Sequence, residues 1–258
     1  MSFLQLDSIS HVFLTSQAAK QAISDLSFSI EEGEFVSLLG PSGCGKSTLL
    51  SIISGLLEPT EGTIILQDKE IHKPGERMGY MLQQDYLFPW KTIEDNCLIG
   101  LKLLNQLTED RKTNTLDLLK KMGLADVRQA YPDQLSGGMR QRVALVRTLA
   151  TNPDLLLLDE PFSALDYQTK LKLEDLVYTT LRDHKKTALL VTHDIGEAIA
   201  MSDRVILLSP RPGKVAKTFE IPTHLKDLLP FDARNDPAFP EYFQLIWKEL
   251  DSFEQSPP

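Results

Sequence analysis

Three uninterrupted apolar runs constrain the fold of this chain more than any other feature. They are LLLLDE at 155–160, TALLVTHD at 187–194 and RVILLS at 204–209. A run that is apolar at every position is typical of a parallel strand buried on both faces, because a strand with one wet face alternates instead. Helix-like segments at about 166–184 and 194–202 lie between the runs. The alternation of strands and helices predicts an α/β fold with a parallel sheet.

The N-terminal part of the chain has a different pattern. Residues 3–14 and 22–30 alternate in polarity, which is typical of half-buried strands. The other predicted elements are a buried strand at 34–39, a helix at 47–57, a hairpin at 62–72, helical structure within 91–130 and a helix from Ser136 to about Thr151.

Composition narrows the class of protein. A chain of 258 residues with 42% hydrophobic content can bury one sizeable core, or a core and a small subdomain. The net charge of -9 argues against nucleic acid as a main partner, because phosphates demand a basic face. Two cysteines fit a reducing compartment. No run approaches the roughly 18 apolar residues of a membrane span. We therefore expect a cytoplasmic protein that reaches a membrane only through a partner.

The stretch GPSGCGKST at 40–48 predicts a phosphate-binding loop. It fits G-x-x-x-x-G-K-[ST] and stands between a predicted strand and a predicted helix. Its glycines let backbone N–H groups point at phosphate oxygens, and the following helix adds its positive end. Lys46 is expected to neutralise the β- and γ-phosphates, Ser47 to bind Mg²⁺ and Thr48 to hold another phosphate. The expected nucleotide contacts are Gly40, Pro41, Ser42, Gly43, Cys44, Gly45, Lys46, Ser47 and Thr48. We expect the Cys44 side chain to be exposed, so that a thiol reagent would block activity.

Two acids and a histidine follow the apolar runs. Asp159 and Glu160 end the run at 155–160, and His193 follows the apolar part of the run at 187–194. Ligands of open α/β sheets sit at the carboxyl ends of the strands. Asp159 is thus placed to meet the metal, Glu160 to act as general base and His193 to contact the γ-phosphate. The alternatives are a surface acidic pair and a structural histidine.

A further stretch, LSGGMRQR at 135–142, has a serine and two glycines at a predicted helix start, as an anion-binding cradle would. Together, six ordered motifs make the chain resemble the ATP-binding subunit of an ABC transporter over roughly residues 3–215. The motifs are GPSGCGKST, Gln83 within YMLQQD, LSGGMRQR, LLLLDEP at 155–161, SALD at 163–166 and THD at 192–194.

The resemblance implies a single ABC ATPase domain: a RecA-like P-loop core with an antiparallel β subdomain and an inserted helical subdomain. The core with the β subdomain would comprise 1–87 and 150–219. The helical subdomain, with LSGGMRQR, would comprise 88–149, and a C-terminal extension would follow at 220–258. Within the extension, FPEYFQLIWKEL has apolar residues at helical spacing, at Tyr242, Leu245, Ile246 and Leu250. It either packs against the core or makes a regulatory or dimer contact.

The resemblance also implies ligands and roles. The ligands are ATP and Mg²⁺, with Ser47, Gln83 and Asp159 at the metal. The catalytic set is Lys46, Gln83, Glu160 and His193. Gln83, rather than Gln84, would sense Mg²⁺ and the γ-phosphate and couple the site to a membrane partner. Phe13 aligns with an aromatic that stacks on adenine; alternatively it is a core or surface residue of an edge strand.

The family arrangement explains why one chain would carry two cradles. Two ATP-binding subunits pack head to tail, and the LSGGMRQR motif of one closes over the nucleotide of the other. A γ-phosphate held by Lys46 still has oxygens that face away from its own loop. Ser136 can donate a hydroxyl there, and Gly137 and Gly138 let the backbone approach. Asp166 would lie along the seam between subunits, cap the helix that follows it, or do both.

The implied function is hydrolysis of ATP to power import of a small solute. The implied partners are a transmembrane permease, a second copy of the chain when ATP is present and, indirectly, a solute-binding protein. The site of action would be the cytoplasmic face of the membrane. FPWKT at 88–92 and SPRPGKV at 209–215 resemble the ATPases of nitrate, sulfonate and taurine importers and of relatives that carry thiamine precursors. The alternative for Phe88-Pro89-Trp90 is a packed aromatic turn.

Two other classes of protein are alternatives to a transporter subunit. A soluble ABC-type ATPase that acts on ribosomes would carry two cassettes, and one that acts on DNA would have a long coiled coil between its halves. A non-catalytic, nucleotide-gated adaptor would not need the complete set of Lys46, Asp159, Glu160 and His193.

Overall fold

The computed structural model describes residues 2–14, 18–75 and 77–255. The chain forms two compact units, and each is described by itself. Unit 1 comprises Met1–Gly75 and Glu174–Pro258, and unit 2 comprises Glu76–Leu173. The division into core, helical subdomain and extension made from the sequence stays a prediction.

Unit 1 contains the buried parallel strands. Strand β3 pairs in parallel with β8 on one side and with β9 on the other, and β10 pairs antiparallel with β9. These strands are β3 (Phe35–Leu39), β8 (Thr187–Val191), β9 (Arg204–Leu208) and β10 (Val215–Glu220). Every residue of β3 and β8 is buried. The strands predicted from the apolar runs at 187 and 204 are therefore confirmed.

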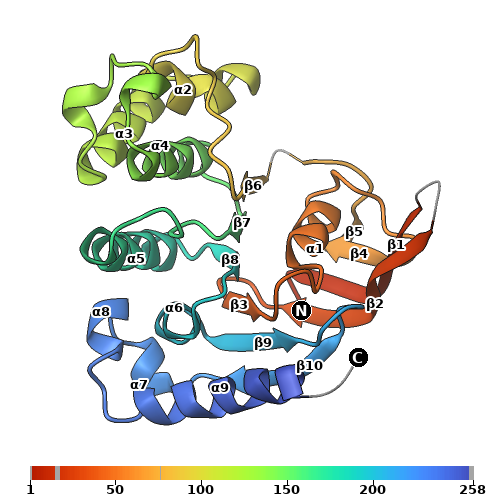
Figure 1. Cartoon of the computed structure of the whole chain (residues 1–258). Helices are drawn as coiled ribbons and strands as arrows, with labels where there is room; N and C mark the ends of the chain where they lie inside the picture. Colours follow the sequence, from red (N-terminus) through yellow and green to blue (C-terminus); the bar gives the residue numbers. More distant parts are fainter. Residues whose placement is uncertain (1, 15–17, 76, 256–258) are drawn as a thin grey trace. The chain divides into compact units, whose positions relative to one another are not determined.

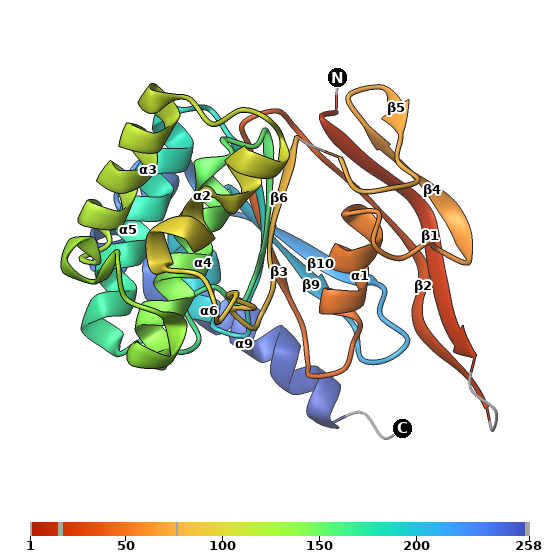
Figure 2. The same ribbon diagram turned by 90° about the horizontal axis from the view of Figure 1, so that it is seen from above.

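An antiparallel sheet of order β2-β1-β4-β5 forms the N-terminal part of unit 1. Its strands are β1 (Leu4–Leu14), β2 (Ala19–Ile30), β4 (Glu61–Leu66) and β5 (Lys69–Glu70). Gln67 and Asp68, both at positive φ, make the turn between β4 and β5, as the predicted hairpin requires. Helix α1 (Lys46–Ile53) lies between this sheet and the parallel strands (Figure 1, Figure 2).

Helix α1 is shorter than predicted. It ends at Ile53, and Gly55, in a left-handed backbone conformation, turns the chain just beyond the helix. A Cβ at Gly55, whose φ is 73°, would stand 2.5 Å from the carbonyl carbon of Lys73. The position therefore needs glycine both for its backbone angle and for its close approach to Lys73.

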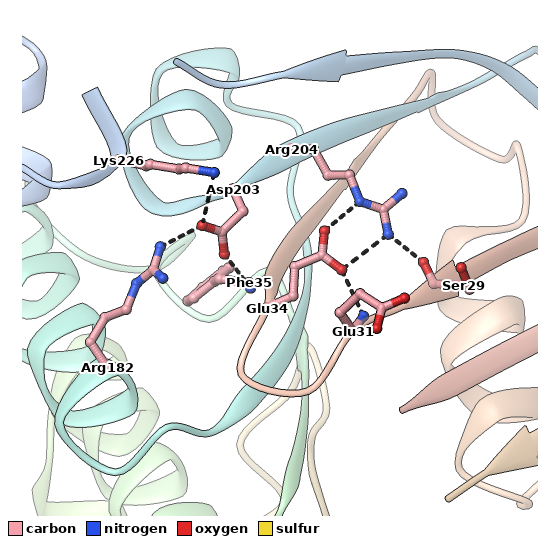
Figure 3. Close-up of polar contacts among 8 residues, drawn as sticks. All are labelled: Ser29, Glu31, Glu34, Phe35, Arg182, Asp203, Arg204 and Lys226. Atoms are coloured by element: carbon pink, nitrogen blue, oxygen red, sulfur yellow. Dashed lines mark hydrogen bonds and ion pairs between the residues drawn. The ribbon is translucent and has the colours of Figure 1, made fainter. Parts of the chain in front are cut away.

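Buried and half-buried charged groups fix the N-terminal ends of β3 and β9. The Arg204 guanidinium contacts the Glu34 carboxylate, with 2.5 Å between Nε and Oε1 (Figure 3). Asp203 accepts hydrogen bonds from the Phe35 backbone N–H at 2.7 Å and from Arg182 Nη2 at 2.7 Å. Because each carboxylate has more than one charged or N–H partner, its burial is compensated. The strand ends opposite to the phosphate loop are thereby anchored.

The C-terminal part of the chain contributes helices to unit 1. They are α6 (Ile195–Met201), α7 (Thr223–Lys226), α8 (Pro230–Ala233) and α9 (Phe239–Gln255). Ile246 of α9 is fully buried in a cluster with α6 and β9, and Tyr242 and Leu250 pack against that cluster. The prediction that this segment packs on the core is confirmed for these residues. It is wrong for Leu245, which is 52% exposed, because only one stripe of α9 faces the cluster.

Unit 2 combines two parallel strands with a helical group. Strand β6 (Met78–Met81) pairs in parallel with β7 (Leu155–Asp159). Helices α2 (Ile93–Leu103) and α3 (Glu109–Lys121) pack on α4 (Gly137–Ala150), as Figure 1 and Figure 2 show. Two short 3-10 turns, Ala125–Val127 and Pro132–Gln134, lie between α3 and α4. The helical structure predicted for 91–130 and from Ser136 is confirmed.

Helix α5 (Tyr167–Asp183) runs from unit 2 into unit 1, and it agrees with the helix predicted at 166–184. Within the described ranges, none of the helices combines the length and the apolar character needed to cross a bilayer.

Candidate functional site

The glycine-rich loop of unit 1 follows β3 and leads directly into α1. Gly45, just before the helix, has a φ of 101°, and Gly43 has a φ of 79°. Residues other than glycine rarely adopt these backbone angles. A Cβ at Gly45 would also stand 3.0 Å from the Ala22 carbonyl oxygen and 3.0 Å from Ile23 Cγ1. The loop can therefore wrap tightly against β2 only with glycine at this position.

The Lys46 side chain folds back onto the start of its own loop. Its Nζ donates to the carbonyl oxygens of Gly40 at 2.7 Å and of Pro41 at 3.0 Å. The ammonium group is thus held over the loop, where backbone N–H groups and a helix start favour an anion. Ser42 and Ser47 are exposed, so their hydroxyls are accessible to a ligand.

The structure corrects the prediction for Cys44. Its side chain is only 1% exposed, and its thiol lies 3.7 Å from Lys46 Nζ. Burial raises the pKa of the Cys44 thiol, and the nearby Lys46 ammonium offsets part of that rise. The predicted exposure of Cys44 is therefore wrong, and because a buried, protonated thiol reacts slowly, we now expect a thiol reagent to act slowly here.

A turn from the far end of the chain supports the same loop. Gly213, in the SPRPGKV segment, donates its N–H to the Ala22 carbonyl at 2.9 Å, and its own carbonyl accepts from Ser24 N at 3.1 Å. A Cβ at Gly213 would stand 2.0 Å from the Cys44 carbonyl oxygen. In the sequence, the only signal for this contact between Gly213 and the loop is the residue type.

Unit 1 holds two further predicted residues. His193 is exposed and follows β8, which runs parallel to β3, so His193 and the phosphate loop follow the same end of paired strands. Phe13 lies near the end of β1, 40% exposed, with its ring against His11 at a centroid distance of 4.5 Å. The exposed face of Phe13 is compatible with stacking on a base, which stays a prediction.

Unit 2 brings the predicted glutamine and the predicted base together. Gln83 follows β6, and Glu160 follows the neighbouring strand β7. Gln83 Nε2 donates to Glu160 Oε2 over 3.2 Å. Glu160 has a φ of 50°, a left-handed angle that is uncommon for a side chain other than glycine. Asp159, the last residue of β7, is 3% exposed.

The LSGGMRQR motif opens helix α4. Ser136 is the N-cap of the helix, and its Oγ accepts a hydrogen bond from Met139 N at 3.3 Å. Ser136 and Gly137 are exposed at the positive end of a helix of 14 residues. An exposed serine hydroxyl and backbone N–H groups at this end can meet an anion brought from outside the subunit.

Asp166 caps helix α5. Its Oδ1 accepts a hydrogen bond from Thr169 N at 3.0 Å, which confirms the capping interpretation. Hydrogen bonds from the Thr169 side chain and backbone lower the pKa of the Asp166 carboxyl. The side chain is exposed, so a role at a subunit seam stays compatible with the cap.

The loop after β6 presents aromatic side chains to the outside. Asn96, fully buried, accepts from Phe88 N at 2.8 Å and donates to the carbonyl oxygens of Phe88, Lys91 and Thr92. This one side chain fixes the FPWKT segment, and nothing in the sequence singled it out. Trp90 is left 71% exposed, with its ring 5.6 Å from that of Phe88.

Comparison with known proteins decides the family. The model of the family described as "ABC transporter" matches residues 23–163, from β2 through the phosphate loop and Asp159 to the turn after Glu160. The chain belongs to the ABC transporter family. An ABC transporter ATP-binding protein, YtlC of Bacillus subtilis, is 58% identical over 99% of this chain and 98% of its own length. The resemblance seen in the sequence is confirmed.

Two relatives carry names that specify a solute. The aliphatic sulfonates import ATP-binding protein SsuB of Bacillus cereus is 38% identical, over 96% of both chains. The taurine import ATP-binding protein TauB of a Jannaschia species is 41% identical, over 86% of this chain and 83% of its own length.

Among solved structures, this ABC family member is similar to the dimeric ATP-binding cassette MJ0796 bound to ADP and Pi, a post-hydrolysis state. The TM-score is 0.77 at 31% identity, over 85% of this chain and 99% of that chain. The fold class predicted from the sequence, an ABC cassette with an antiparallel β subdomain, is confirmed. The phosphate loop, Phe13 and His193 belong to unit 1. Gln83, Ser136, Gly137, Gly138, Asp159, Glu160 and Asp166 belong to unit 2.

Proposed function

We propose that this chain is the ATP-hydrolysing subunit of an importer in the sulfonate and taurine group, working with a separate permease. The observation that carries the proposal is the intact phosphate loop, with Lys46 held inside it, in a chain that matches a sulfonate-import ATPase over 96% of both lengths. Asp159 ends β7, and Glu160 is the next residue. These residues provide for hydrolysis as well as for binding.

The reaction is transfer of the γ-phosphoryl group of ATP to water. The loop N–H groups and Lys46 hold the phosphates, and Phe13 stacks on adenine. Glu160 accepts a proton from the attacking water, and His193 contacts the γ-phosphate. Gln83, already hydrogen-bonded to the Glu160 carboxylate, is the residue that responds to the γ-phosphate.

Mg²⁺ is the metal that fits the residues assigned to it. Ser47, Gln83 and Asp159 offer hydroxyl, amide and carboxylate oxygens, which are the donors that Mg²⁺ prefers. When bound, the ion would neutralise charge on the phosphate oxygens. The Ser47 side chain is exposed, so its hydroxyl is accessible to the ion. Asp159 ends a buried strand, so its carboxylate has little freedom to move.

Two kinds of partner complete the function. A second copy of the chain places Ser136, Gly137 and Gly138 on the nucleotide held by the first, which is consistent with the dimeric cassettes that the fold matches. A permease holds the subunit at the cytoplasmic face of the membrane. The exposed Trp90 and Tyr86, on the loop after β6, form the apolar contact that such a partner would cover.

Substitution of the general base tests the function. Wild-type chain should hydrolyse ATP when Mg²⁺ is present. Glu160→Gln should lose turnover by at least about 100-fold, in line with loss of a general base, while ATP converts it to a dimer on sizing chromatography. Glu58→Gln, at an exposed glutamate, is the control and should behave as wild type. Turnover by Glu160→Gln at the wild-type rate, or a monomer in saturating ATP, would contradict the assignment.

The solute follows from the partners, because the binding protein and the permease select it. Mass spectrometry of the ligand in a binding protein that co-purifies with the complex should find a sulfonate. A pyrimidine precursor of thiamine would move the chain to the other group that its FPWKT and SPRPGKV segments resemble.

A further inference from the structure

Gln141, in the LSGGMRQR motif, is a buried polar residue that has no role in the proposed function. Gln141 lies on α4 beyond the Ser136 cap, and its side chain is only 5% exposed. An amide withdrawn from water is costly unless both its donor and its acceptor are used. The partners of Gln141 therefore show what holds it in place.

Both ends of the Gln141 amide bind the turn after β7. Its Nε2 donates to the Glu160 carbonyl oxygen over 3.0 Å, and its Oε1 accepts from Ala164 N over 3.0 Å. One side chain from α4 thus spans the turn from the residue that follows β7 to the SALD motif. This contact is between elements of unit 2 only.

The turn needs such support because Glu160 is strained. A left-handed φ of 50° in a residue with a side chain persists only where the surroundings hold it. The Glu160 carbonyl accepts from Gln141 Nε2, from Ser163 N at 3.2 Å and from Ser163 Oγ at 3.0 Å. The Glu160 carboxylate, at the other end of the residue, accepts from Gln83. Gln141 on α4 therefore holds the backbone of Glu160, and Gln83 in the loop after β6 holds its side chain.

A second contact joins the same helix to the same turn. A Cβ on Gly138 would stand 3.1 Å from Leu165 Cδ2 and 3.2 Å from the Ala164 carbonyl oxygen. The glycine thus allows α4 to lie directly on the turn. Because helix α4 lies directly on the turn, the Gln141 side chain joins two backbone segments that are in contact. Its hydrogen bonds can therefore define where the Glu160 carbonyl points.

We propose that Gln141 is a positioning residue for ATP hydrolysis: through its hydrogen bond to the Glu160 carbonyl it aims the Glu160 carboxylate at the attacking water. The inference rests on the proposed function, in which Glu160 is the general base. Gln141 itself touches neither ATP nor water. Its loss should lower the rate of the chemical step and leave the binding of ATP to the phosphate loop unchanged, since no residue of that loop contacts it among the hydrogen bonds of the described residues.

Two variants of Gln141 separate positioning from packing. Gln141→Glu keeps the size of the side chain and an acceptor for Ala164 N, and it replaces the donor to the Glu160 carbonyl with a second oxygen. Gln141→Leu removes both bonds. Thr148→Val, on the same helix, is the matched control, because its buried hydroxyl bonds only to the Ala144 carbonyl within α4 among the contacts described.

The measurements are steady-state ATP hydrolysis by the full chain and its thermal unfolding. Both Gln141 variants should lower kcat about 10- to 100-fold, as expected for a displaced catalytic group, with KM for ATP within about twofold of wild type. In a Glu160→Gln background, Gln141→Leu should cause no further loss of the residual rate. Thr148→Val should keep the wild-type kcat.

The outcomes distinguish this inference from the proposed function. Wild-type kcat in both Gln141 variants, beside an inactive Glu160→Gln, overturns the positioning role and leaves the function standing. A further loss in the Glu160→Gln background, or a failure of both Gln141 variants to fold while Thr148→Val folds, shows a structural role and also overturns it. A wild-type chain without ATPase activity would instead overturn the proposed function.

Discussion

Replacement of Gly213 by alanine tests how firmly the SPRPGKV turn supports the phosphate loop. The new Cβ would stand 2.0 Å from the Cys44 carbonyl oxygen and 3.2 Å from its carbonyl carbon. Carbon–oxygen contacts in proteins are normally about 3.3–3.6 Å, so one of the two backbones must move by more than about 1 Å. The neighbour is main chain and cannot rotate away as the end of a side chain would.

Either movement has a measurable cost. If the turn moves, it loses the hydrogen bonds that Gly213 makes with Ala22 and Ser24. If the loop moves, Lys46 leaves its place over the Gly40 and Pro41 carbonyls, because it is only two residues beyond Cys44. Forced overpacking of this kind costs about 1–3 kcal/mol. If this cost reduces the free energy of ATP binding, each loss of about 1.4 kcal/mol raises the Kd for ATP tenfold.

Calorimetric titration with ATP and urea unfolding measure the two costs. We expect Gly213→Ala to raise the Kd for ATP about tenfold or to lower the free energy of unfolding by about 1–3 kcal/mol. Gly33→Ala is the control: its φ is 77°, but its Cβ would meet nothing closer than the Lys185 carbonyl oxygen at 3.8 Å. It should lose about 1 kcal/mol of stability through backbone strain and bind ATP normally. A Gly213→Ala chain with wild-type ATP affinity and wild-type unfolding would refute the reasoning.

Two further predictions concern buried ionisable groups. Arg234→Met removes the guanidinium that lies 2.7 Å from the fully buried Glu174 carboxylate, and it should lower the free energy of unfolding by about 3–5 kcal/mol in a urea titration. Lys217→Met removes an exposed ion pair with Glu249 and should cost no more than about 1 kcal/mol in the same titration. Equal losses in the two variants would contradict the prediction. Burial raises the pKa of the thiols of Cys44 and Cys97, so the unfolded chain releases these protons first as pH rises. These thiols therefore do not change the free energy of unfolding below about pH 8.5, and they lower it above that pH. The urea midpoint should fall between about pH 8 and 10, and in Cys97→Ala that fall should be smaller than in wild type.

The sequence was sufficient where a local pattern determines a local structure. The apolar runs before Asp159 and His193 identified buried strands, since only burial on both faces favours such runs. Ser136 was correctly placed at a helix start, because a serine followed by a long helical segment can cap it. Gln83 was assigned only through the family resemblance, and its contact with Glu160 comes from the pairing of β7 with β6, a strand that was not predicted.

The sequence was insufficient where a residue's surroundings come from distant segments. Cys44 is buried because the loop wraps back on itself and the Gly213 turn packs against its backbone, and no spacing within 40–48 encodes that contact. Gln141 looks like an ordinary polar residue of a helix until the turn at Glu160 is placed beside it. Asn96, which organises the loop before α2, is hidden for the same reason.

Mixing two inactive variants tests most directly the claim that each nucleotide is completed by the neighbouring copy. Lys46→Ala removes the phosphate contact, and Ser136→Glu places a negative charge where the partner's γ-phosphate would lie. Neither should hydrolyse ATP alone. A mixed dimer joins the intact Lys46 of one copy to the intact Ser136 of the other, so an equimolar mixture should regain about a quarter of the wild-type rate, with half the dimers mixed and one of two sites complete in each. A mixture as inactive as its parts, or wild-type hydrolysis by Ser136→Glu alone, would contradict the account.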